Sequence, residues 1–169
     1  MNNDRIVVLD GARTPIGSFG GMFKDVPAFE LGATAAVEAL SRAKVDPADI
    51  REVVMGCIGQ VGPDAYNARR VAVRAGLSTS VPAYTVNRLC GSGLQAVWSA
   101  AMEMRWNDLD FVLAGGDESM TRMPFYDFGG RSFINAIIYR DINTCFSEAV
   151  NHSPANPSRA AGNQRNPAP

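Results

Sequence analysis

Residues 86–104 have the sequence VNRLCGSGLQAVWSAAMEM, in which a cysteine separates a predicted strand from a predicted helix. Tyr84–Val86 is a short apolar run typical of a strand. Gly91–Met104 is small and apolar on almost every face, and a helix of that kind is normally buried. The segment therefore predicts a strand that leads into a buried helix, with Cys90 held rigidly at the junction.

The same alternation of strand and helix extends outward from this segment. Short apolar runs predict further strands, and apolar residues at helical spacing predict further helices. Asp46-Pro47 is typical of a cap that begins a short helical turn, and Gly76 is typical of a helix end. The predicted strands are Ile6–Leu9 (a buried strand), Val53–Gly56 and Phe111–Ala114, and the predicted helices are Phe29–Ala43 and Asn67–Ala75. Strands that alternate with helices predict an α/β fold with a mostly parallel sheet.

Cys90 is the candidate nucleophile because a helix start presents unpaired N–H groups and a partial positive charge. Both favour a thiolate, and the same N–H groups stabilise the oxygen of a thioester as it becomes tetrahedral. Gly91 and Gly93 leave the approach to the sulfur free of side chains. The residues alone leave two alternatives open. Cys90 is a small hydrophobic residue buried in the core, or Gly91 and Gly93 belong to a phosphate-binding turn, although Ala96 stands where the third glycine of that motif would be.

Composition excludes several classes of protein. The chain has 169 residues, a net charge of −1 and no run of about 18 apolar residues, so we expect neither nucleic-acid binding nor membrane association. The start, MNNDRIVVLD, lacks the pattern of a secretory signal, and the three cysteines form neither a disulfide framework nor a metal site. We expect a cytoplasmic protein with no metal ligands.

The composition changes near Gly129. Residues 1–128 carry the regular apolar segments, whereas the end of the chain is NHSPANPSRAAGNQRNPAP from Asn151. Such a stretch has too little apolar surface to offset the entropy of ordering. We therefore expect one domain over residues 1–128 and a largely disordered tail over residues 129–169.

Four segments together resemble the thiolase family. VNRLCGSGLQA (86–96) is similar to its acyl-enzyme signature, and IVVLDGARTPIGSFGG (6–21) is similar to its opening. VVMGCIGQVGPDAYNARRVAVRAGL (53–77) and VLAGGDESMTRMP (112–124) continue the resemblance in the family's order and spacing. The resemblance covers about residues 4–128, which correspond to the N-terminal half of a thiolase.

This resemblance implies an acyltransferase of fatty acid metabolism that joins or cleaves acyl-CoA thioesters by Claisen condensation or thiolysis. Cys90 matches the cysteine that forms the acyl-enzyme, and its backbone N–H matches one oxyanion donor. The branch favoured is acetyl-CoA C-acetyltransferase. The family needs no metal or redox cofactor, since coenzyme A thioesters are its substrates, and its full-length members are homo-oligomers.

The sequence also departs from the family. The Asn-Glu-Ala-Phe, Gly-His-Pro and Cys-x-Gly-Gly-Gly segments, which supply the histidine base and the second cysteine, do not occur. His152 and Cys145 lie in other settings and do not replace them. We therefore expect an incomplete thiolase-like fold that is inactive alone and marginally stable or self-associating. The alternative function is a dead remnant of a truncated or frame-shifted thiolase.

Other polar residues are interpreted more simply. Cys57 is expected to be a buried structural thiol, and Glu118 a structural hydrogen-bonding residue. Asp117 occupies a position that the family more often fills with an uncharged residue, and the sequence does not decide between disturbed packing and solvent exposure. The arginines of one helix are expected to form a solvated face, with contact to CoA phosphates or to a partner subunit as the alternative: Arg69, Arg70 and Arg74.

Overall fold

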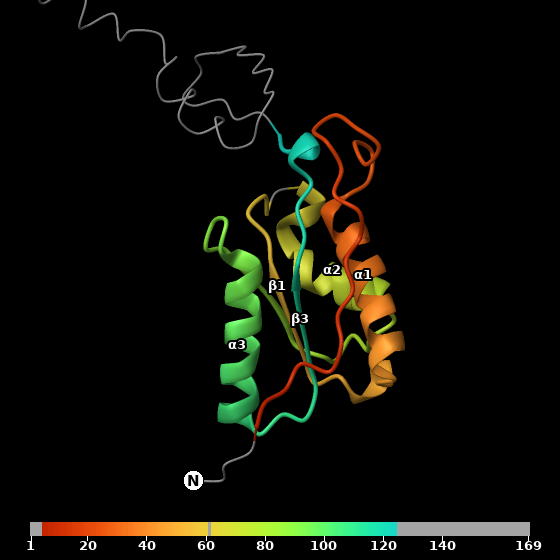
Figure 1. The fold of residues 1–169 in the computed structure, drawn as a ribbon. Helices are drawn as coiled ribbons and strands as arrows, with labels where there is room; N and C mark the ends of the chain where they lie inside the picture. Colours follow the sequence, from red (N-terminus) through yellow and green to blue (C-terminus); the bar gives the residue numbers. More distant parts are fainter. Residues whose placement is uncertain (1–4, 61, 125–169) are drawn as a thin grey trace, which may run out of the picture. The chain divides into compact units, whose positions relative to one another are not determined.

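The computed structural model describes residues 5–60 and 62–124. Its described part is a three-layer α/β arrangement around a parallel sheet of three strands in the order β2-β1-β3 (Figure 1). The strands are β1 (Glu52–Gly56), β2 (Ala83–Val86) and β3 (Val112–Gly116). Helices α1 (Ala28–Ala43) and α2 (Asn67–Arg74) cover one face, and α3 (Ser92–Asn107) covers the other. Three short 3₁₀ helices join them, at Pro47–Asp49, Gly62–Tyr66 and Met120–Arg122.

The central strand β1 connects two cores. Successive strand side chains point to opposite faces, so Val53 faces the helices α1 and α2 while Val54 faces α3. Both valines have no exposed surface. On the α3 side the core is made of small residues, since Ala96 and Ala100 pack against Val54. A strand buried on both faces explains the continuous apolar run of β1.

Most of the elements predicted from the sequence are confirmed within three residues of the predicted bounds. The Asp46 carboxylate accepts a hydrogen bond of 2.9 Å from the Ala48 N–H, which confirms the cap of the short helical turn. Gly76 follows α2 with φ +86°, a left-handed conformation that glycine adopts without steric cost. The predicted parallel sheet is also confirmed.

The prediction of a buried strand at Ile6–Leu9 is wrong. These residues have no regular secondary structure, and Val8 is 82% exposed. A strand requires a neighbour for its backbone hydrogen bonds, and no other described strand pairs with this segment. The apolar run alone could not reveal whether such a neighbour is present.

The prediction of a buried α3 holds for one face of the helix only. Leu94, Trp98, Met102 and Trp106 follow one another at intervals of four residues and are 58–89% exposed. These four side chains form an exposed apolar stripe on the side of α3 away from Ala96 and Ala100. The sequence indicated correctly that α3 is apolar, but within the described residues only one face of it is covered.

A close backbone approach fixes the start of α3. A Cβ atom placed on Gly56 would lie 2.6 Å from the Gly93 nitrogen and still closer to the Ser92 carbonyl carbon. The end of β1 therefore touches the backbone of α3 with no side chain between them. Gly116 at the end of β3 is also close, because its Cβ would lie 3.2 Å from the Gly93 Cα.

The predicted tail over residues 129–169 lies outside the described residues.

We expect Gly56→Ala to lower the free energy of unfolding by about 1–3 kcal/mol, because the methyl group must displace the backbone of α3. Gly93→Ala is the matched control, since nothing lies within 4 Å of its Cβ position. Urea unfolding followed by circular dichroism measures both. Equal stability of the Gly56→Ala variant and the parent chain would contradict the close approach.

The exposed apolar stripe predicts that the 169-residue chain self-associates and binds a hydrophobic dye. Replacing both Trp98 and Trp106 with Gln should reduce dye fluorescence and shift sedimentation toward the monomer. Arg105→Gln, on the same helix and also exposed, is the control and should change neither measurement. A parent chain that sediments as a monomer and binds no dye would contradict the prediction that the stripe causes self-association.

Candidate functional site

A hollow of about 370 Å³ lies at the carboxyl edge of the sheet. The ends of β1 and β3 and the turn after β2 meet there, because parallel strands place their carboxyl ends on one side. Its lining includes Cys57, Leu89, Cys90, Gly93, Asp117 and Glu118. This edge of an open α/β sheet is where such folds bind ligands.

Cys90 lies in this hollow at the predicted junction of strand and helix. It is exposed, and Gly91, the N-cap of α3, follows it directly. No side chain caps α3, and the Gly93 and Leu94 amides have no hydrogen-bond acceptor among the described residues. The head of a 16-residue helix with free N–H groups therefore lies beside an accessible thiol. The role of Cys90 as the nucleophile stays a prediction.

Cys57 is the second thiol of the hollow and differs from Cys90 in every respect that matters for reactivity. It is 1% exposed, which confirms the predicted burial. Burial raises the pKa of the Cys57 thiol far above its usual value, and the negative charges of Glu118, Asp117 and Asp64 raise that pKa further. Cys57 therefore stays a neutral thiol at physiological pH.

Glu118 has the structural role predicted for it. Its two carboxylate oxygens accept hydrogen bonds from the Ile58 N–H at 2.8 Å and from the Gly59 N–H at 3.1 Å. The Cys57 Sγ lies 3.9 Å from one of them. The carboxylate thereby holds the loop after β1 against the end of β3.

Asp117 is half-buried beneath α1 and α2, so its side chain does not simply face solvent. One carboxylate oxygen accepts a hydrogen bond from the Asn67 side-chain amide. The other oxygen, Oδ2, and the Asn67 Oδ1 are both buried without a hydrogen-bond partner. Burial raises the pKa of Asp117 to about 7; the hydrogen bond from Asn67 lowers that pKa, and the charges of Asp64 and Glu118 raise it by smaller amounts. Sequence reasoning missed Asn67, whose only signal was a polar residue at the head of α2.

The predicted arginine cluster is not a uniformly solvated face. Arg74 forms an ion pair of 2.8 Å with Glu30 of α1, and Arg69 donates a hydrogen bond to the Thr79 carbonyl. The Arg70 guanidinium lies 3.7 Å from the centroid of the Phe29 ring. The alternative, contact with CoA phosphates, receives no support from these contacts inside the chain.

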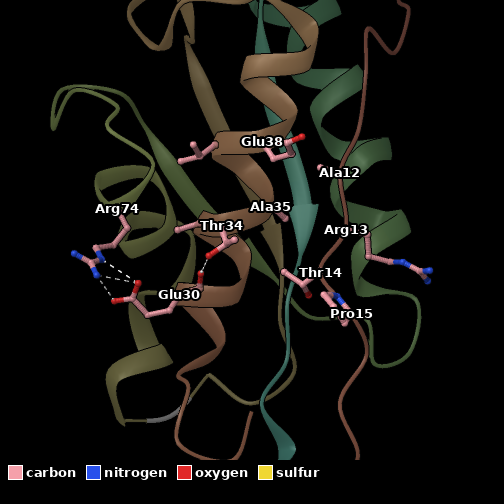
Figure 2. A pocket seen from close by; sticks show the side chains of 11 residues that line it. Ala12, Arg13, Thr14, Pro15, Glu30, Thr34, Ala35, Glu38 and Arg74 are labelled. Atoms are coloured by element: carbon pink, nitrogen blue, oxygen red, sulfur yellow. Dashed lines mark hydrogen bonds and ion pairs between the residues drawn. The ribbon is translucent and has the colours of Figure 1, made fainter. Parts of the chain in front are cut away.

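A larger hollow of about 740 Å³ lies elsewhere, between the segment Ala12–Pro15 and α1 (Figure 2). Its polar lining includes the ion-paired Glu30 and Arg74, while the Arg13 side chain points away from α1. It contains no cysteine and shares no residue with the hollow at Cys90. The chemistry-bearing residues are therefore in the smaller hollow.

The sequence model of the family described as "Thiolase, N-terminal domain" matches residues 6–137. The chain belongs to the thiolase family. This confirms the resemblance inferred from the four sequence segments.

Named thiolase relatives are similar over most of this chain. A "Probable acetyl-CoA acyltransferase" of Staphylococcus epidermidis RP62A is 46% identical over 120 residues, which are 71% of this chain and 30% of that protein. A protein of the same name from Staphylococcus aureus MRSA252 is 38% identical over 152 residues, covering 85% of this chain and 39% of that protein. The crystal structure of the Bacillus anthracis acetyl-CoA acetyltransferase superposes with a TM-score of 0.70 at 38% identity, covering 74% and 32% of the two chains. The chain thus spans about a third of the length of these thiolases.

The remaining predicted positions lie outside the described part of this thiolase chain. Cys145 and His152 are in the range 125–169. Residues 5–60 and 62–124 contain no histidine, and among them no cluster of three or more His, Cys, Asp or Glu residues could hold a metal ion. No helix of the same ranges is long and apolar enough to cross a membrane. Within the described residues, Cys90 therefore has no histidine as a neighbouring base.

The pKa of Asp117 predicts that stability falls as pH rises from about 4 to 7. An unfolded Asp loses its proton near pH 3.9, whereas the folded chain keeps the proton on Asp117 to about pH 7. The folded state binds more protons in this window, so raising the pH favours unfolding until both states are ionised. Asp117→Asn should remove this slope and stabilise the chain by about 1–3 kcal/mol at pH 8.

Urea unfolding at pH 4.5, 6 and 8 measures this difference. The new amide also supplies a donor for the unpaired Asn67 Oδ1, which adds to the gain. The exposed Asp110→Asn is the matched control and should follow the parent chain at every pH. Parallel curves for the parent and Asp117→Asn would show that Asp117 is ionised throughout.

Proposed function

We propose that this chain carries the acyl-accepting nucleophile, Cys90, of a thiolase-family acyltransferase that acts on acyl-CoA thioesters. The observation that supports this most is the exposed thiol at the head of α3, in the hollow where three parallel strands end. The names of the relatives, acetyl-CoA acyltransferase and acetyl-CoA acetyltransferase, indicate the same substrates.

The acyl-transfer step follows from this placement. The Cys90 Sγ forms a bond to the carbonyl carbon of the thioester, the bond between that carbon and the CoA sulfur breaks, and the thiol proton ends on the CoA sulfur. The carbonyl oxygen carries negative charge in the tetrahedral intermediate. Unpaired N–H groups at the start of α3 supply a positive potential at that place.

Carbon–carbon bond formation requires a base and an acid as well as the nucleophile. The described residues contain no histidine, and the sequence lacks the family's Gly-His-Pro and Cys-x-Gly-Gly-Gly segments. We therefore propose that complete turnover depends on groups that these 169 residues do not supply. General acid–base assistance contributes about 10²–10⁴ in rate, which is the deficit expected for this chain alone.

We also propose the enzyme branch, from the names of the relatives, and the cellular location, from the two free thiols. Acetyl-CoA C-acetyltransferase is the favoured branch, because the similar solved structure carries that name. Coenzyme A thioesters are substrates, and the proposed chemistry uses no metal or redox cofactor. The free thiols Cys57 and Cys90 support a reducing, cytoplasmic location. A homo-oligomer is proposed for the full-length protein.

The proposed role predicts that acetyl-CoA acetylates one site, Cys90. Incubation of the chain with acetyl-CoA, followed by peptide mass spectrometry, should find the acetyl group on Cys90 and release of an equal amount of CoA. Iodoacetamide should alkylate Cys90 at least roughly ten times faster than Cys57, because the Cys57 thiol is buried and protonated.

Cys90→Ser is the control and should abolish both reactions at that site while leaving unfolding unchanged. Equal and slow alkylation of Cys57 and Cys90, without acetylation of either, would instead favour the alternative of a non-catalytic remnant. Steady turnover by this chain alone would show that it carries a base that the proposal does not include.

A further inference from the structure

We propose that Ser92 is the positioning residue that presents the Cys90 thiol at the head of α3. This inference rests on the proposed role of Cys90. Ser92 is 4% exposed and is the first residue of α3, two positions after the cysteine. The Ser92 hydroxyl forms its hydrogen bonds with the turn that carries Cys90 and not with the Cys90 Sγ itself.

The Ser92 hydroxyl joins two peptide groups that precede Cys90. Its oxygen accepts a hydrogen bond of 2.8 Å from the Arg88 N–H, and its O–H donates one of 2.6 Å to the Leu89 carbonyl. The Ser92 backbone N–H donates to the same carbonyl at 2.9 Å. The plane of the peptide bond between Leu89 and Cys90 is therefore fixed by two donors from one residue.

The direction of these bonds distinguishes Ser92 from an ordinary helix cap. A capping serine lies at the N-cap and accepts from the N–H groups of the second or third helical residue. Here the N-cap is Gly91, and α3 has no side-chain cap bond. The Ser92 hydroxyl points backward, to Arg88 and Leu89, so its bonds stabilise the turn rather than the first donors of the helix.

The turn requires such support because Leu89 has φ +50°. This left-handed conformation brings the Cβ of a residue other than glycine close to its own backbone, and it persists only where neighbours hold it. The Leu89 N–H is held by the Asn87 side chain at 3.0 Å, and the Asn87 amide in turn donates to the Ile58 carbonyl at 3.3 Å. Ser92 holds the other side of Leu89.

Ser92 is itself immobilised by the sheet. A Cβ on Gly56 would collide with the Ser92 backbone, so the end of β1 lies directly against this residue. The chain of contacts runs from β1 through Ser92 to the Leu89 carbonyl and then to Cys90. Loss of the hydroxyl breaks the last link while α3 and the sheet keep their packing.

The test compares alkylation of Cys90 by iodoacetamide in variants of the full 169-residue chain across pH 5–10. Ser92→Ala should slow alkylation at pH 7 by about five- to a hundredfold, the range expected from the loss of both hydrogen bonds of the hydroxyl, and move the half-maximal rate to higher pH. Ser92→Thr, which keeps the hydroxyl, should stay within about twofold of the parent chain. Ser99→Ala, on the same helix, is the matched control and should change nothing.

A merely structural role for Ser92 would lower the denaturation midpoint without moving the pH profile, and that result would overturn the inference. If Ser92→Ala does not fold, Ser92→Val is compared with Ser92→Thr, because the two side chains have nearly the same shape and differ in the hydroxyl. Equal profiles for these two would also overturn it. Acetylation of the parent chain by acetyl-CoA separately tests the proposed function, so its failure is distinguishable from a failure of the Ser92 effect.

Discussion

The contact between the end of β1 and the head of α3 is the constraint on which the candidate site depends. With no side chain at Gly56, the strand touches the backbone of Ser92 and Gly93 directly. This contact sets where the unpaired N–H groups of α3 lie relative to the carboxyl edge of the sheet. Because Cys90 is tied to Ser92 through the Leu89 carbonyl, the same contact sets the place of the thiol.

Two thiols in one hollow show how local surroundings divide roles. Cys57 is buried directly after the central strand β1, beside three carboxyl groups, so its thiol stays protonated. Cys90 follows an outer strand of the described sheet and lies exposed at a helix start. Glu118 binds the backbone amides of the loop that follows Cys57. No described carboxylate makes a corresponding contact near Cys90.

Local sequence pattern predicted the elements whose partners are present. The strands β1, β2 and β3 and the three helices could be predicted because each has apolar residues at the spacing of its element, and boundary residues such as Gly76 after α2 mark some of their ends. Ile6–Leu9 has the same apolar character but no described strand beside it, and pairing is a property of two segments that one segment cannot show. The prediction of a buried α3 held for one face only for the same reason, since burial of the other face depends on what packs against it.

The candidate site divides in the same way. The position of Cys90 followed from a strand, a cysteine and a glycine-flanked helix start, all of which are adjacent in sequence. The pair of Asn67 and Asp117 joins residues 50 positions apart, and Ser92 matters through a hydrogen bond that runs backward along the chain. No sequence pattern marks Ser92, and the left-handed Leu89 that gives it a role becomes visible only in the fold. Residues whose role depends on their neighbours in the sequence could be predicted, and residues whose role depends on contacts made by the folded chain could not.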